Sequence, residues 1–325
     1  MSDETEAGQR VAGESATGPS VSRATEAGQR AAGECAADRH PLHIVGLRSW
    51  AINLLSRAGI ESADVDAELL IGHVLGFSRG QVQAKAITGA LVEPPDAASI
   101  VDAIERRAAR EPLQHITGLA PFRSIELAVG PGVFVPRPET ELVAQFAIDA
   151  LVSAGGAAPI GVDLGTGSGA IALAMATEVP HARVYAVENS PTAFVWAKTN
   201  FTAVAGDNAR LVFVDLADAL PELDGTVDVV ISNPPYIPLG AIPRDPEVRL
   251  FDPEHALYGG EDGLDVVRLV SATARRLLHP GGTLVLEHGE LQAASIAQLL
   301  AADGWRAIAT HPDLLGRDRA TTALR

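Results

Sequence analysis

The chain has 325 residues, 47% of them hydrophobic and 20% charged, and its formal net charge at pH 7 is −16. This length suits two domains, because one domain commonly holds roughly 100–200 residues. The acidic balance disfavours a protein that grips nucleic-acid backbones, and no apolar run approaches the roughly 20 residues of a membrane-spanning helix.

Residues 1–40 contain an internal repeat, in which the segment from Thr5 to Arg10 recurs from Thr25 to Arg30. This region has almost no large apolar side chains and cannot bury a core, so we predict a disordered N-terminal extension. It also lacks the apolar stretch of a signal peptide. The only cysteine, Cys35, lies here, which excludes an intramolecular disulfide and a cysteine metal cluster.

The segment from Pro41 to Arg110 has apolar residues mostly at three-to-four spacing, which is the period of an amphipathic helix. The pattern is broken at Gly59, Gly76, Gly89 and the Pro94-Pro95 pair, where helices should end or begin. We therefore predict a small helical domain over residues 41–118.

A β-hairpin is predicted over residues 119–136, linking this domain to the rest of the chain. Apolar and polar residues alternate from Ile125 to Val129, Gly130-Pro131-Gly132 gives a turn signal, and Val133 to Val135 resumes an extended pattern. The proline-rich segment from Pro136 to Glu141 then leads into a helix.

A nucleotide-binding corner is predicted where the apolar strand from Ile160 to Leu164 runs into Gly165-Thr166-Gly167-Ser168-Gly169 and a helix follows. Glycines allow a tight turn and a close approach of the backbone to a ligand. Alone, this pattern also fits a dinucleotide-binding oxidoreductase.

Polar residues end the next three predicted strands, namely Glu188, Asp215 and Asn233. Open α/β sheets bind ligands at the carboxyl ends of their strands. The last of these strands stops at Asn233-Pro234-Pro235-Tyr236, where proline cannot extend a β-ladder. This loop should present an amide side chain and an unpaired backbone carbonyl to a planar NH2 group, with Tyr236 as a wall.

Together, the glycine loop, Glu188, Asp215 and Asn233 to Tyr236 resemble the signature blocks of S-adenosylmethionine-dependent methyltransferases that act on planar nitrogens. The resemblance implies S-adenosyl-L-methionine as cofactor and S-adenosyl-L-homocysteine as product. It implies cofactor contacts from Gly165, Thr166, Gly167, Ser168, Gly169, Glu188, Asp215, Leu216 and Asn233. Asn-Pro-Pro-Tyr is not needed by a dehydrogenase.

Glu111 to Gly118, the predicted hairpin and Pro136 to Glu141 resemble, more narrowly, the release factor glutamine methyltransferases, as do the blocks Pro246 to Arg249, Ala256 to Gly260 and Glu287 to Gly289. The resemblance implies N5 methylation of the glutamine in the Gly-Gly-Gln motif of peptide chain release factors. Catalysis would depend on Asn233, Pro234 and Tyr236, and substrate binding on the whole loop, including Pro235, together with Phe122.

The C-terminal half completes a doubly wound sheet, because helical and strand patterns alternate and residues 305–309 and 320–324 should form an antiparallel pair. The predicted fold is a Rossmann-like, seven-stranded α/β methyltransferase domain over residues 137–325. It follows the extension, the helical domain and the hairpin, and the resemblance implies that the helical domain recognises the substrate.

Other functions stay open at this point. The acceptor could be a ribosomal-protein glutamine or an exocyclic amine of DNA adenine or ribosomal RNA guanine, and the chain could be a non-catalytic cofactor-binding module. We expect a cytoplasmic enzyme with a release factor as partner, without membrane or direct nucleic-acid binding. The dispersed histidines predict no metal site.

Overall fold

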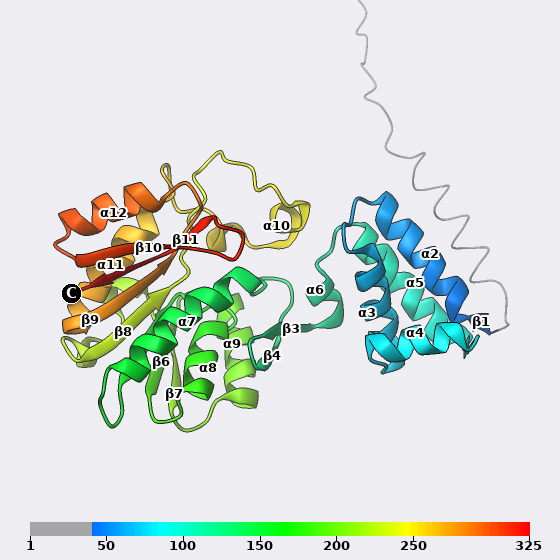
Figure 1. Ribbon diagram of the computed structural model, residues 1–325, viewed down its shortest axis with the longest axis horizontal. Coiled ribbons are helices and arrows are strands. Elements are labelled where there is room, and N and C mark those ends of the chain that lie inside the picture. Colours follow the sequence, from blue (N-terminus) through cyan, green and yellow to red (C-terminus); the bar gives the residue numbers. More distant parts are fainter. Residues whose placement is uncertain (1–40) are drawn as a thin grey trace, which may run out of the picture.

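The computed structural model describes residues 41–325, so the repeat predicted to be disordered over residues 1–40 lies outside the described residues. Figure 1 shows a helical part, in blue and cyan, beside a larger part built on a twisted sheet. A short helix and a hairpin connect the two.

The helical part contains four helices that pack around their own apolar core. Gly59, Gly76 and Gly89 lie just beyond the first three helix ends, and the fourth helix begins at Pro94, as the sequence indicated. The four helices are α2 (Ile44–Arg57), α3 (Ala63–Leu75), α4 (Arg79–Ile87) and α5 (Pro94–Ala108), and the two-residue strands β1 (Leu42–His43) and β2 (Leu91–Val92) pair beside them.

Helix α4 begins with reciprocal side-chain capping. The Ser78 hydroxyl accepts a hydrogen bond from the Gln81 amide at 3.3 Å, and the Ser78 amide donates to Gln81 Oε1 at 2.8 Å. This arrangement satisfies two backbone donors that a helix start leaves without partners.

The connection consists of α6 (Leu113–Thr117) and a hairpin of β3 (Leu119–Phe122) and β4 (Ile125–Ala128). The predicted hairpin exists, but its turn lies at Arg123 and Ser124 rather than at Gly130 to Gly132. Residues 133–135 join no ladder. Val133 and Val135 are instead fully buried in the core, which explains their apolar character without a strand.

The larger part is a seven-stranded sheet in the order β10-β11-β9-β8-β5-β6-β7, in which β11 is antiparallel to both of its neighbours. The predicted α/β sheet with an antiparallel terminal pair is therefore confirmed. The strands are β5 (Ile160–Leu164), β6 (Arg183–Glu188), β7 (Ala209–Phe213), β8 (Val227–Ser232), β9 (Leu278–Glu287), β10 (Arg306–Pro312) and β11 (Asp318–Leu324).

Helices cover both faces of this sheet, and alternate strand residues divide between two cores. Ile231 of β8 belongs to the core under the first helix group, whereas its neighbour Val230 belongs to the core under the second. The first group is α7 (Pro138–Ser153), α8 (Ala170–Glu178) and α9 (Pro191–Val204), and the second is α11 (Asp265–Leu277) and α12 (Ala293–Ala302).

Glu247 ties the sheet domain to the helical domain. It lies on α10 (Pro246–Phe251), in the long segment between β8 and α11, and α10 lies on the side facing the helical part in Figure 1. Its carboxylate binds Arg107 at 2.8 Å and Arg110 at 2.7 Å. Arg107 also binds Asp66 at 2.7 Å. Among residues 41–325, no helix is long and apolar enough to cross a membrane.

Candidate active site

A cavity of about 930 Å³ lies at the carboxyl ends of the parallel strands, where the sequence predicted a ligand site. It extends from the glycine loop after β5, past the end of β8, to the end of β9. Ten of the predicted site residues line it: Gly165, Thr166, Gly167, Ser168, Glu188, Leu216, Asn233, Pro234, Pro235 and Tyr236.

The glycine loop is bound to the end of β6. The Gly165 and Thr166 amides both donate to the Val187 carbonyl at 2.9 Å, and the Gly167 amide donates to Glu188 Oε2 at 2.8 Å. Gly165 and Gly167 have φ of +75° and +59°, and a β-carbon on either would have no heavy atom within 4 Å. The space in front of both residues is therefore open for a ligand to approach the backbone.

The Glu188 carboxylate is held in place by backbone amides. Besides Gly167, the Asn189 and Ser190 amides donate to its Oε1 at 3.0 and 2.8 Å. The side chain is buried, yet it lines the cavity, and Oε2 has a lone pair left after its single bond. An acceptor fixed beside a glycine cradle fits the ribose hydroxyls of S-adenosylmethionine.

Gly169 and Asp215 lie outside the cavity lining, contrary to the contacts implied for them. Gly169 begins α8, where a β-carbon would be 2.9 Å from the Phe201 ring, so its role is packing. The Asp215 carboxylate accepts from the Asn189 side chain and the Ala217 amide, both at 3.0 Å. Asp215 thereby positions two lining residues, its neighbour Leu216 and Asn189.

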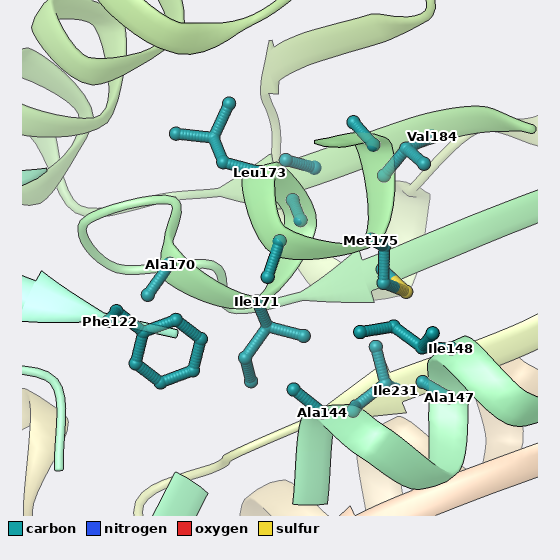
Figure 2. Packing of buried hydrophobic residues seen from close by; sticks show 14 of the residues in the cluster. Phe122, Ala144, Ala147, Ile148, Ala170, Ile171, Leu173, Met175, Val184 and Ile231 are labelled. Carbon is teal, nitrogen blue, oxygen red and sulfur yellow. The ribbon is translucent and has the colours of Figure 1, made fainter. Parts of the chain in front are cut away.

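Phe122 is not beside the cavity, and its predicted contact with substrate is wrong in this structure. Its side chain is 1% exposed and belongs to the core under α7 and α8. Figure 2 shows the ring next to Ala170 and Ile171. The hairpin turn at Arg123 follows this residue directly, whereas Phe134, further along the chain, does line the cavity.

The loop from Asn233 to Tyr236 follows β8 directly, since β8 ends at Ser232. Backbone contacts hold the loop from behind. The Tyr236 carbonyl accepts from Gln292 Nε2 at 2.8 Å, and Gln292 Oε1 accepts from the Gly289 amide at 2.9 Å. Ile237 pairs with the segment around Tyr258 through bonds of 2.8 and 2.9 Å. These contacts fix the loop relative to β9 and α12.

Behind Asn233 lies a polar cluster that sequence reasoning missed as functional. Asn233 Nδ2 donates to the Thr140 hydroxyl at 3.4 Å. The nearby Glu287 side chain is 2% exposed, and burial raises its pKa to about 7 although hydrogen bonds with Thr140 and Asn233 oppose the rise. Thr140 lies in the first turn of α7 and Glu287 ends β9, within two sequence blocks that the family resemblance had singled out without giving them roles.

Tyr236 completes this end of the cavity. Its hydroxyl accepts from Arg319 at 3.5 Å, and burial raises the pKa of Tyr236 to about 12, so the phenol stays protonated at neutral pH. Arg137 also lines the cavity and binds the buried carboxylate of Asp252 at 2.8 Å.

A second cavity, of about 590 Å³, lies between the helical domain and the segment carrying α10. Arg107, Arg110 and Glu247 line it. Arg137, Asp245 and Val248 line both cavities, so the two cavities lie next to each other. Within residues 41–325, no group of three or more histidine, cysteine or acidic side chains could hold a metal ion.

Known proteins match nearly the whole described chain. Residues 46–118 match the PrmC N-terminal domain, and residues 125–243 match the methyltransferase small domain. A release factor glutamine methyltransferase of Streptomyces coelicolor is 48% identical over 278 residues, covering 84% of this chain and 95% of that protein. One from Bifidobacterium longum is 43% identical and covers 85% and 97%. The chain belongs to the release factor glutamine methyltransferase family.

Membership confirms the resemblance, the S-adenosylmethionine-dependent methyltransferase activity and its cofactor as the sequence predicted them, and it rules out the dehydrogenase alternative. One relative of similar identity is named for a different methyl acceptor. A protein of Streptomyces pristinaespiralis named 4-amino-L-phenylalanine/4-methylamino-L-phenylalanine methyltransferase is 42% identical, covering 85% of this chain and 92% of that protein.

Proposed function

We propose that this protein methylates the N5 amide nitrogen of the glutamine in the Gly-Gly-Gln motif of peptide chain release factors. The observation that carries the proposal is the corner after β8, where Asn233, which has a side-chain amide oxygen, and Pro234, which has a carbonyl free of any ladder, line the same cavity as the glycine loop. Two acceptors close together match the two hydrogens of a carboxamide. Family membership supports this choice of acceptor.

Positioning is the main task of such a site. A carboxamide nitrogen is a weak nucleophile, because its lone pair is delocalised into the carbonyl group. S-adenosylmethionine supplies a strongly electrophilic methyl group when bound. Asn233 Oδ1 and the Pro234 carbonyl would each accept one amide hydrogen, which orients the nitrogen and favours the positive charge that develops on it. Orientation of this kind contributes up to roughly 7–11 kcal/mol.

The remaining residues fill supporting roles. Pro235 and Tyr236 form the wall against the glutamine side chain, and Phe134 takes the place first expected for Phe122. The glycine loop and Glu188 hold the cofactor, with Leu216 against its base and Asp215 fixing that corner. No general base is needed before transfer, because the methylated nitrogen becomes acidic and loses its proton readily.

The domains follow from this assignment. We assign substrate recognition to the helical domain, residues 41–118, since this domain lines the second cavity, which lies next to the active-site cavity. A release factor is the proposed partner and the cytoplasm the proposed location. The net charge of −16 argues against a nucleic-acid acceptor.

One other acceptor has a specific observation in its favour, namely an aromatic amine of an amino acid, because of the relative from Streptomyces pristinaespiralis. An aniline NH2 is planar enough to meet the same two acceptors. A free amino acid, however, would have no use for the cavity that extends to the helical domain.

A labelling experiment tests the proposal. The protein is incubated with S-adenosylmethionine carrying a labelled methyl group and with a release factor, beside a factor whose Gly-Gly-Gln glutamine is alanine. We expect label only on the intact factor. Equal labelling of both factors, or labelling of 4-aminophenylalanine alone, would refute the proposed acceptor.

Asn233→Ala tests the corner itself. The variant should lose about 100-fold or more in kcat, as when one preorganised contact to a developing charge is removed, while its affinity for S-adenosylmethionine stays within a few-fold. Near-normal turnover would contradict the role of Asn233.

A further inference from the structure

The Glu287 carboxyl has an oxygen without any partner. Oε2 is buried and accepts no hydrogen bond, although the residue lines the main cavity. A buried acceptor left without a donor is unfavourable, so its retention at this position needs a reason. Nothing in the proposed positioning by Asn233 and Pro234 uses Glu287 directly.

The groups around Glu287 donate and accept hydrogen bonds in a fixed order. Asn233 Nδ2 donates to the Thr140 hydroxyl oxygen at 3.4 Å, and the Thr140 and Asn233 side chains both lie beside the Glu287 carboxyl and favour its ionised form. A carboxylate can only accept. An ionised Glu287 therefore takes the hydroxyl hydrogen of Thr140, and the Thr140 oxygen is then free to accept from the Asn233 amide.

This direction decides which end of the Asn233 amide faces the cavity. An asparagine side chain presents either an acceptor or a donor, depending on its rotation about the terminal bond. With Nδ2 held by Thr140, Oδ1 is left for an incoming NH2 group. With the amide reversed, the Asn233 NH2 group would face the NH2 group of the substrate. Two hydrogen-bond donors would then oppose each other, and the substrate would be repelled.

We propose that Glu287, acting through Thr140, is a positioning residue that fixes the Asn233 amide with its oxygen toward the substrate nitrogen. The inference rests on the proposed function, because it gives Asn233 the task of accepting an amide hydrogen. When Glu287 is protonated, it can donate its own hydrogen to the Thr140 hydroxyl. Thr140 can then donate to Asn233 instead of accepting from it, and the Asn233 amide can reverse.

Charged groups from two elements face this carboxyl. Arg319 of β11 favours its ionised form, whereas Glu139 of α7 opposes it, and Glu139 is itself paired with Arg317 at 3.0 Å. The Tyr236 phenol lies beside it and stays neutral. Since burial raises the pKa of Glu287 to about 7, the switch between the two directions falls near neutral pH.

Thr140→Val and Thr140→Ser form a matched pair of tests. Valine keeps the shape but removes the hydroxyl, and serine restores it. Thr140→Val should lower kcat roughly 10–100-fold, with KM for the release factor and cofactor affinity within about 3-fold, because only a preorganised contact is lost. Thr140→Ser should retain kcat within about 3-fold of the wild type. Equal kcat for the valine and serine variants would overturn the proposal.

A pH profile and a spectroscopic signal test Glu287. The kcat of the wild type should fall below about pH 7, the pKa given for Glu287, and Glu287→Gln should lack this acid limb. With isotope-labelled asparagine, the Asn233 side-chain NH2 resonance should titrate over the same range in the wild type and not in Glu287→Gln. An unchanged limb or an unchanged NH2 titration in this variant would refute the role.

The spectroscopic signal also separates the two proposals. It requires no acceptor, so it reports on Glu287, Thr140 and Asn233 even if the release factor is not labelled. Failure of labelling with a normal NH2 titration would refute the acceptor and retain the positioning chain. Normal labelling of the release factor without the NH2 titration would retain the proposed acceptor and refute the positioning role of Glu287.

Discussion

Gly259 lies so close to Pro235 that a β-carbon on the glycine would be 2.4 Å from the Pro235 carbonyl oxygen. The segment after α10 therefore supports the Asn233 to Tyr236 loop by backbone contact, with no room for a side chain. The geometry of the corner after β8 depends on this close approach.

Gly259→Ala should displace the loop and lower kcat, because a shift of about 1 Å at a reacting group can cost about 100-fold. Cofactor affinity should change little, since the glycine loop is built from β5 and β6. Steady-state kinetics and cofactor titration measure the two effects. Gly80→Ala is a matched control, because a β-carbon there meets nothing within 4 Å. Normal kcat in Gly259→Ala would show that the loop does not need this support.

Glu247→Gln should weaken the joint between the two domains. The variant removes the charge that binds Arg107 and Arg110 while nearly keeping the side-chain shape. We expect KM for the release factor to rise several-fold and cofactor affinity to stay unchanged. Asp64→Asn serves as control, because its ion pair with Arg79 at 3.6 Å is exposed and such surface pairs contribute about 1 kcal/mol or less. An equal effect of both variants would contradict a specific joint.

Phe122→Ala should act on stability, since the ring lies in the core. Removal of a buried phenylalanine costs about 3–5 kcal/mol in free energy of unfolding. Phe134→Ala, by contrast, should cost less stability and should raise KM for the protein substrate. Urea denaturation and kinetics on both variants distinguish them. A Phe122→Ala variant of normal stability but poor turnover would restore the substrate contact that the sequence suggested.

Asp163→Asn should change the pH dependence of stability. Burial raises the pKa of Asp163 to about 7, above its ordinary value of 3.8, although bonds from Thr166 and the Ala172 amide oppose the rise. A carboxyl with a raised pKa stabilises the fold at low pH, and this contribution is lost as pH rises through the folded-state pKa. Asp163→Asn has no ionisable carboxyl at this position, so its free energy of unfolding lacks this decline.

The free energy of unfolding of Asp163→Asn, relative to the wild type, should therefore increase from about pH 4 to pH 7 by roughly 2–4 kcal/mol. Urea unfolding at several pH values measures it. A constant difference across that range would mean that Asp163 ionises normally in the folded protein.

Local sequence patterns were sufficient to predict most of the fold. Glycines placed the helix ends in the N-terminal domain, and apolar runs marked the strands that lead to Glu188, Asp215 and Asn233. The hairpin was misplaced because Gly130-Pro131-Gly132 is a strong turn signal, whereas the actual turn at Arg123 uses a non-glycine residue with φ of +52°. Tertiary packing of Val133 and Val135 overrode the alternation.

Site residues that directly follow one strand could be predicted from the sequence. Site residues that come together only through the packing of several elements could not. Asn233 could be read from the prolines behind it. Thr140 and Glu287 come from α7 and β9, and only the sheet order β9-β8-β5 brings them beside Asn233. A threonine at a helix start and a glutamate at a strand end have ordinary explanations, so no local pattern marked them.

Gln292, which supports the loop from behind, has a consequence for an enzyme whose proposed acceptor is glutamine. Its own carboxamide belongs to a residue that lines the same cavity, but Nε2 donates to the Tyr236 carbonyl at 2.8 Å and to the Gly263 carbonyl at 3.4 Å. Both of its hydrogens are committed to the backbone of the protein. Gln292 is thereby held as a brace of the loop and does not occupy the place of the substrate glutamine.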